Sequence, residues 1–203
     1  MIEWGGNDLD WAAQFLSNSR LKHVERVVLL AVELCRRHQL PCINAVKRAG
    51  ALHDIAKFLS PEQLTAIGIP SHIRYSRLYQ AYQPVWHAFA GAAMVKYLDV
   101  CQDHVILSAI KWHTTGRPDM TTVEQVIFVA DFCEPGRGHP LAKAVAEIAH
   151  QSLDLATAII SQFLVKTIRS ENCFSATIKC AEFYQRTISK KDATIVRSCL
   201  NIN

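Results

Sequence analysis

Apolar residues recur along the chain at helical spacing, and the strict alternation typical of half-buried strands is almost absent. Each apolar stripe ends near a capping or breaking residue such as Ser, Asp, Pro or Gly, so the pattern divides into separate helices. The predicted helices cover residues 8–16, 19–38, 41–57, 61–68, 85–98, 101–112, 121–132, 140–150, 153–169 and 172–188. The sequence therefore predicts an all-α fold with short connecting loops.

Some stretches fall outside this regular pattern. Residues 69–84, rich in Tyr, Arg and Pro, predict an irregular segment or a short helix, and a Pro-Gly-rich break follows the helix at 121–132. There is no internal repeat and no linker long enough to separate domains. We therefore expect an N-terminal helical extension at 1–18, a single helical domain at 19–190, and a frayed tail at 191–203.

Composition and charge limit the kinds of binding partner that the protein can have. Half of the 203 residues are hydrophobic, yet no apolar run approaches the roughly 18 residues of a membrane span, and the N-terminus lacks a signal-peptide pattern. The net charge is +4 with scattered basic residues, which argues against nucleic acid as a partner. Seven cysteines with no C-x-x-C pair indicate reduced thiols. These features predict a cytoplasmic protein that binds neither membrane nor nucleic acid.

A histidine and an aspartate, His53 and Asp54, stand together in a run of small and apolar residues. An unpaired carboxylate in such surroundings is costly, so Asp54 needs a partner or a cation. Further predicted helices each place one imidazole or carboxylate on an apolar stripe. These candidates are His23, His87, His113 and Asp131. Convergence of such groups predicts a metal site.

For any single histidine on an apolar face, a hydrogen-bonded core residue is the commoner explanation. Asp131 argues against it here, because no Arg or Lys shares its stripe to neutralise a buried carboxylate. Four other histidines occupy a polar face, loops or a helix end, namely His38, His72, His104 and His139, and the setting of His150 is ambiguous. We leave all five out of the site.

Three stretches carry a resemblance to a known family: LHDIAK at 52–57, WHTTGRP at 112–118 and FVADFCEPGR at 128–137. They resemble the HD-domain superfamily of metal-dependent phosphohydrolases, and within it the YqeK branch, which splits diadenosine tetraphosphate symmetrically into two ADP. The likeness extends from about His23 to the Tyr184 region. It departs where related chains often carry Tyr-Ile, because this chain has Phe132-Cys133, a change that we expect to affect packing only.

The resemblance implies an HD-domain helical bundle that holds two divalent or mixed-valence metal ions. One ion is expected on His23, His53, Asp54 and Asp131, and Asp54 is expected to bridge to a second ion on His87 and His113. Imidazole and carboxylate ligands without thiolate favour iron, with manganese as the alternative. Two such ions could share a hydroxide that attacks an inner phosphate.

Substrate contacts are predicted around these ligands. We assign catalytic roles to Asp54, as the bridging ligand, and to Lys57 and Arg117. The two basic residues are chosen because the leaving oxygen needs a cation near it. The alternative for Lys57 is that its amine extends to solvent. The residues predicted to bind substrate are Lys57, Thr114, Thr115, Gly116, Arg117, Glu134 and Arg137. For Glu134 and Arg137, orientation of ligands, nucleotide binding and pairing with each other all stay open.

Several alternative functions also stay open. Another HD phosphohydrolase could act on a guanosine alarmone or a nucleoside monophosphate, and a mixed-valent di-iron oxygenase could use a similar ligand set. A cyclic-dinucleotide hydrolase would require a Gly-Tyr-Pro signature that the chain lacks. A non-catalytic module is disfavoured because every ligand position is retained. A homodimer could form through the apolar stripe of Ile159, Ile160, Phe163 and Leu164, and no determinant of adenine over guanine is visible.

Overall fold

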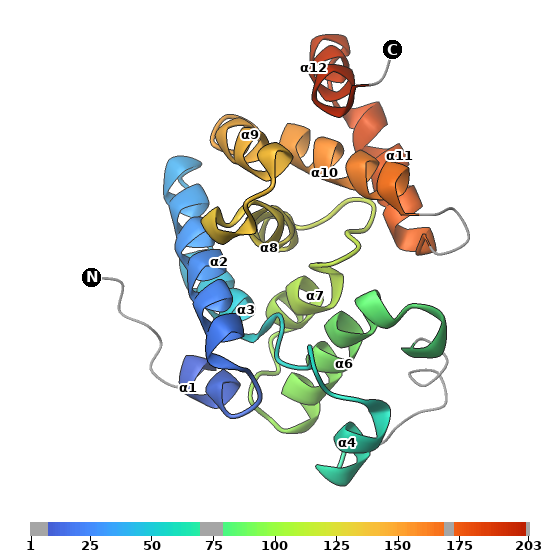
Figure 1. Ribbon diagram of the computed structural model, residues 1–203. Helices are drawn as coiled ribbons and strands as arrows, with labels where there is room; N and C mark the ends of the chain where they lie inside the picture. Colours follow the sequence, from blue (N-terminus) through green and yellow to red (C-terminus); the bar gives the residue numbers. More distant parts are fainter. Residues whose placement is uncertain (1–7, 70–78, 169–172, 202–203) are drawn as a thin grey trace.

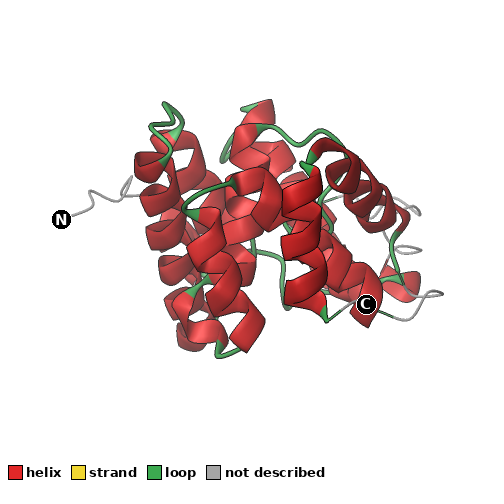
Figure 2. Cartoon of the chain, turned by 90° about the horizontal axis from the view of Figure 1, so that it is seen from above, coloured by secondary structure: helices red, strands yellow, loops and turns green. Residues whose placement is uncertain are grey.

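The computed structural model describes residues 8–69, 79–168 and 173–201 of the chain. All regular structure in these ranges is helical, which confirms the all-α prediction. Figure 2 shows the helices joined by short loops. Much of the stretch expected to be irregular, 70–78, lies outside the described residues.

Four helices form the centre of the molecule: α2 (Asn18–Arg37), α3 (Ile43–Leu52), α7 (His104–Trp112) and α8 (Thr122–Cys133). Helix α2 packs on α3 and α8, α3 packs on α7, and α7 packs on α8. Helices α2 and α3 approach closely at Gly50, where an added Cβ would lie 2.9 Å from a Val28 methyl group. These helices position most of the predicted ligands.

The remaining helices cover the centre from several sides (Figure 1). Helix α6 packs on α7, whereas α10 packs on α8, α9 and α11. Their bounds are α1 Asp8–Ala13, α4 Pro61–Ala66, α6 Gln83–Tyr97, η1 Pro135–Arg137, α9 Pro140–Ala149, α10 Leu153–Thr167, α11 Ser175–Thr187 and α12 Lys190–Leu200. None of the helices in the described ranges is long and apolar enough to cross a membrane.

Helix boundaries differ from the sequence prediction at the N-terminal end. Helix α1 ends at Ala13 rather than near Leu16. Helix α2 is capped by Ser17, whose hydroxyl accepts a hydrogen bond from the Arg20 amide at 3.4 Å, so the expected Ser19 cap was wrong. Both serines match the capping preference, and the backbone of Ser17 has the extended conformation that a cap requires.

The His53-Asp54 pair follows α3 instead of lying within a helix, which corrects the prediction. The His53 ring donates from Nδ1 to the Gly50 carbonyl at 2.7 Å, and a continuing helix would offer that carbonyl to the amide of Asp54. The chain tightens into turns, with the Lys57 amide bonded to the Asp54 carbonyl at 2.8 Å. The pair is therefore presented at the end of a helix.

The C-terminal segment is the other difference. Helix α12 covers most of the stretch expected to fray, which corrects the prediction for residues 191–200. Ser189 caps this helix, and Val196 and Leu200, one turn apart, are buried. Helix α12 packs on α10, and the Lys166 amine donates to the Leu200 carbonyl at 2.6 Å. This apolar pair was too short a stripe to recognise in the sequence. The proposed division into 1–18 and 19–190 stays a prediction.

Candidate metal centre

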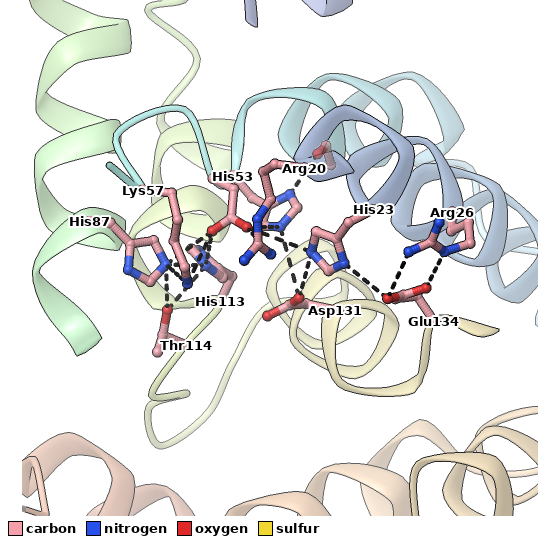
Figure 3. Close-up of polar contacts among 12 residues, drawn as sticks. Arg20, His23, Arg26, His53, Lys57, His87, His113, Thr114, Asp131 and Glu134 are labelled. Atoms are coloured by element: carbon pink, nitrogen blue, oxygen red, sulfur yellow. Dashed lines mark hydrogen bonds and ion pairs between the residues drawn. The ribbon is translucent and has the colours of Figure 1, made fainter. Parts of the chain in front are cut away.

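The structure brings the six predicted ligands together from five segments of the chain (Figure 3). Helices α2, α6 and α8 contribute one residue each, the turn after α3 contributes two, and one follows the end of α7. All are buried except Asp131, whose side chain is 18% exposed. The residues are His23, His53, Asp54, His87, His113 and Asp131.

The two carboxylate oxygens of Asp54 face different histidines. Oδ1 lies 3.1 Å from His87 Nε2 and 3.7 Å from His113 Nε2. Oδ2 lies 3.6 Å from His23 Nε2 and 3.5 Å from His53 Nε2. Asp54 therefore stands between two pairs of imidazoles and presents one oxygen to each pair.

Asp131 joins one of these pairs only. Its Oδ1 lies 3.1 Å from His23 Nε2 and 3.9 Å from His53 Nε2. The side that includes Asp131 thus has two imidazoles and two carboxylates, and the opposite side has two imidazoles and the shared Asp54. The ligand atoms of His23, His53 and Asp131 lie within 4.8 Å of one another, as do those of His53, Asp54 and His113.

The hydrogen bonds of the rings point the Nε2 atoms toward the centre. Nδ1 of His53 bonds to the Gly50 carbonyl and Nδ1 of His113 to the Ile110 carbonyl, both at 2.7 Å. Since a carbonyl only accepts, each Nδ1 carries a proton, and in the neutral ring Nε2 keeps the lone pair. His23 Nε2, His53 Nε2 and Asp54 Oδ1 are buried without a hydrogen bond within the described part of the chain. Buried acceptors of this kind fit a cation.

Protonation also suits metal ligation. Burial lowers the pKa of His87 to about 4 and lowers the pKa of His113, so both rings are neutral at neutral pH. Burial alone would raise the pKa of Asp54 and of Asp131, but the charge of His53 and hydrogen bonds with neighbouring imidazoles outweigh burial and lower both. Without metal, burial would lower the pKa of His53, but the charge of Asp54 raises it. Neutral imidazoles and ionised carboxylates are the forms that bind metal.

Three cationic side chains approach the two aspartates. Arg20 Nη1 lies 2.9 Å from Asp54 Oδ2, and Arg137 Nη2 lies 2.5 Å from Asp131 Oδ1. Lys57 Nζ lies 3.5 Å from Asp54 Oδ1. No Arg or Lys lies on the helical stripe of Asp131, but Arg137 reaches it from the following turn, so the expectation of an unneutralised carboxylate was wrong. Arg20 was not predicted, although helical spacing from His23 was the signal.

Glu134 holds the ring of His23. Its Oε1 lies 3.0 Å from His23 Nδ1, and its Oε2 accepts from Arg26 Nε at 2.5 Å. Burial would raise the pKa of Glu134, but the bonds to Arg26 and His23 lower it to about 2. Of the alternatives left open for Glu134, this geometry matches the orientation of a ligand. The Arg137 guanidinium bonds to Asp131, so the side chains of Glu134 and Arg137 bond to other residues, although the Arg137 amide donates to the Glu134 carbonyl at 3.0 Å.

The loop after His113 begins with three of the residues predicted to bind substrate. Only Thr114 lies at the centre, with its hydroxyl 3.0 Å from His113 Nε2. Thr115 is buried and donates to the Gly116 carbonyl at 2.9 Å. Gly116 has φ +62°, and an added Cβ would lie 2.6 Å from Cys180 Sγ, so this glycine serves a turn against α11. The contacts of Thr115 and Gly116 are structural ones, and their substrate roles stay predictions.

Arg117 is likewise a structural residue. Its Nε and Nη2 donate to the two oxygens of buried Glu124 at 2.9 and 2.8 Å, and its Nη1 donates to the Pro118 carbonyl at 3.0 Å. Burial would raise the pKa of Glu124, but the contacts with Arg117 and Ser108 lower it. These three bonds give the guanidinium a structural role, and its phosphate contact and catalytic role stay predictions.

A cavity of about 480 Å³ opens beside the ligands. Its polar part is formed by Lys57, His113, Thr114, Asp131 and Arg137. The rest of its wall consists mainly of apolar and aromatic side chains, among them Phe128, Phe132, His139, Ile160, Phe163 and Leu164. His139, which the sequence analysis left out of the site, and Phe132, expected to affect packing only, both lie on this wall.

The fold and the site together define a class: a helical domain that gathers imidazoles and carboxylates around a His-Asp pair, as metal-dependent hydrolases do. The family model described as HD domain matches residues 20–136. The chain is 34% identical over 165 residues to the symmetrical bis(5'-nucleosyl)-tetraphosphatase of Bacillus subtilis (strain 168), covering 79% of this chain and 82% of that protein.

Two further comparisons agree. The symmetrical bis(5'-nucleosyl)-tetraphosphatase of Staphylococcus aureus (strain NCTC 8325 / PS 47) is 30% identical over 179 residues, covering 85% of this chain and 90% of the relative. A crystal structure of a predicted HD superfamily hydrolase involved in NAD metabolism, from Clostridium acetobutylicum, matches with a TM-score of 0.75 and 27% identity, covering 89% and 96% of the two chains. The chain belongs to the HD-domain superfamily, in its branch of symmetrical bis(5'-nucleosyl)-tetraphosphatases.

Proposed function

We propose that this protein uses bound divalent metal to hydrolyse dinucleoside tetraphosphates symmetrically, so that diadenosine tetraphosphate gives two ADP. The observation that carries the proposal is the division of the Asp54 oxygens between two pairs of imidazole Nε2 atoms. A carboxylate placed in this way can serve two cations, and the relatives with this activity extend over most of the chain.

The ligand set follows from the geometry. His23, His53, Asp54 and Asp131 would hold one ion, and Asp54, His87 and His113 would hold the other. Metal ions in such pairs supply a nucleophilic oxygen at neutral pH and polarise phosphate oxygens. We propose iron, with manganese as the alternative, because the donors are nitrogen and oxygen without thiolate.

Three side chains of the cavity would bind the phosphates: Lys57, Thr114 and Arg137. Lys57 Nζ lies 3.1 Å from His87 Nε2, and that nitrogen cannot accept from Lys57 and bind a cation together. With metal bound, the amine would therefore turn to a phosphate oxygen, where its charge offsets the charge that develops on the leaving group. The Arg137 side chain is 39% exposed, lines the same cavity and can do the same.

The reaction balances with water as the only co-reactant. The oxygen of water adds to one inner phosphorus, and the bond from that phosphorus to the central bridging oxygen breaks. The bridging oxygen leaves with the other half of the substrate, and the two protons of water are shared between products and solvent. Each half becomes a nucleoside diphosphate.

The test is product analysis. The protein is incubated without dioxygen with diadenosine tetraphosphate and ferrous or manganous ion, and the nucleotides are separated by anion-exchange chromatography. We expect ADP alone. A mixture of AMP and ATP would overturn symmetrical cleavage, no hydrolysis would overturn the function, and turnover that requires dioxygen would favour the di-iron oxygenase.

The compartment and the oligomeric state are separate proposals. We propose a reducing, cytoplasmic setting because all seven thiols are free. A homodimer stays a prediction, and α10 offers little support for it. Ile159 and Ile160 are buried within the chain, whereas Phe163 and Leu164 line the cavity.

A further inference from the structure

The cavity extends from the ligands onto two helix faces. On α8, Phe128, Asp131 and Phe132 are spaced three and four residues apart, so a proposed metal ligand and an aromatic side chain share one face. Helix α10 contributes its own face with the same spacing, through Ile160, Phe163 and Leu164. Since α8 and α10 pack directly on each other, the apolar wall is fixed relative to Asp131.

Two aromatic side chains on the apolar wall of the cavity remain partly exposed. Phe132 and Phe163 are half-buried, whereas the neighbouring Phe128 is only 2% exposed. The Phe132 and Phe163 rings pack edge to face, with centroids 5.7 Å apart and an interplanar angle of 72°. Such a pair, left open to a cavity beside charged groups, is typical of a site for an aromatic ligand.

His139 lies on the same apolar wall of the cavity. Its ring packs edge to face on Phe163, with centroids 5.4 Å apart. Its Nδ1 accepts a hydrogen bond from the Leu141 amide at 3.2 Å, so the neutral ring carries its proton on Nε2. The wall therefore combines aromatic faces with one hydrogen-bond donor, which suits a nucleobase better than an aliphatic group.

We propose that Phe132, Phe163 and His139 form a subsite for one nucleobase of the substrate, which stacks on one phenylalanine ring and contacts the other. The inference rests on the proposed function, because the phosphates must lie at the polar end. The ligands occupy one side of the cavity, so an inner phosphate at that side leaves the apolar part to a single nucleoside. A volume of about 480 Å³ lies in the range of about 300–1,000 Å³ that small-ligand pockets show.

Binding measurements on the metal-loaded protein test the subsite. The affinities for ADP and for pyrophosphate, which has no base, are measured by calorimetry for the wild type and for Phe163→Ala. We expect the wild type to prefer ADP and the variant to lose about tenfold or more of its ADP affinity, with pyrophosphate affinity unchanged. Phe183→Ala is the matched control, because Phe183 is half-buried against Tyr184 and does not line the cavity.

Three results of these binding measurements would contradict the proposed subsite. Equal losses for ADP and pyrophosphate, an unchanged ADP affinity, or a wild type that does not prefer ADP over pyrophosphate would overturn the subsite. A Phe163→Leu variant provides a second measurement if Phe163→Ala fails to fold, and the same selective loss is expected. Failure of the proposed function would show differently, as a wild type that prefers ADP over pyrophosphate but does not hydrolyse diadenosine tetraphosphate.

Discussion

Two buried carboxylates of this protein, Asp54 and Glu124, have opposite surroundings. Both oxygens of Glu124 accept hydrogen bonds from Arg117, and the carboxylate also accepts from Ser108 and from the Thr121 amide. Asp54 lies among four imidazoles, with Arg20 2.9 Å from Oδ2 and Lys57 3.5 Å from Oδ1, and its Oδ1 makes no hydrogen bond within the described ranges. A fully satisfied carboxylate stabilises the fold, whereas a buried carboxylate oxygen that faces imidazoles without a hydrogen bond provides a place for a cation.

Of the substitutions that test this difference, Asp54→Asn is expected to have the largest effect, on metal binding and turnover. The amide keeps the shape of the side chain but removes the negative charge that both proposed metal positions share. We expect loss of both ions and a fall of about 10³-fold or more in turnover, with a metal-free melting temperature close to that of the wild type. Metal analysis and product chromatography measure the two effects. A variant that keeps two ions and normal turnover would contradict the account.

The counterpart on the other carboxylate is Arg117→Met, which leaves Glu124 buried without its cation. We expect the free energy of unfolding to fall by about 2–4 kcal/mol, less than for a wholly buried pair because the Arg117 side chain is 30% exposed. Metal content should not change. Urea unfolding measures the loss. Normal stability with a large rise in KM would instead restore the phosphate contact that the sequence suggested for Arg117.

Glu134→Gln tests whether orientation of His23 matters. The amide still reaches His23 but loses the charge-assisted bond to Arg26. We expect metal affinity to fall by about 10–100-fold, as for other partners of metal ligands. Competition with a chelator measures the affinity, and Glu33→Gln, at an exposed carboxylate that contacts His150, is the control. An unchanged affinity would mean that Glu134 serves only to hold Arg26.

The pH dependence of stability gives the smallest effect. The pKa of Glu124 is lowered from 4.5 in the folded protein, so its stabilising contribution is complete above about 4.5 and is lost as pH falls through the folded value. The stability difference between the wild type and Glu124→Gln should therefore be largest near neutral pH and shrink as the pH falls below about 4.5. Unfolding curves between pH 7 and 3 measure it. A constant difference would contradict the ion pair.

Helical spacing explains how much could be predicted from the sequence. Positions three and four residues apart share a face, so His87 and Asp131 could be assigned to apolar stripes without coordinates. The end of α3 at Leu52 could not be predicted from the sequence, because it depends on the hydrogen bond from the His53 ring to the Gly50 carbonyl. Local competition between a side chain and the backbone is invisible to periodicity.

Contacts between residues of different helices and loops could not be predicted from the sequence either. The motif WHTTGRP suggested that Arg117 binds phosphate, and only the packing of its loop on the start of α8 reveals the bond to Glu124. The apolar wall was missed for the same reason. Phe132 and Phe163 lie on helices that are separate in sequence, and only their packing makes one surface.

Anomalous diffraction from crystals of the manganese-loaded protein tests the central claim most directly. The account predicts two ions, one on each oxygen of Asp54, with His23, His53 and Asp131 around the first and His87 and His113 around the second. Ions located elsewhere, or a single ion that leaves one of these histidine pairs unused, would contradict it.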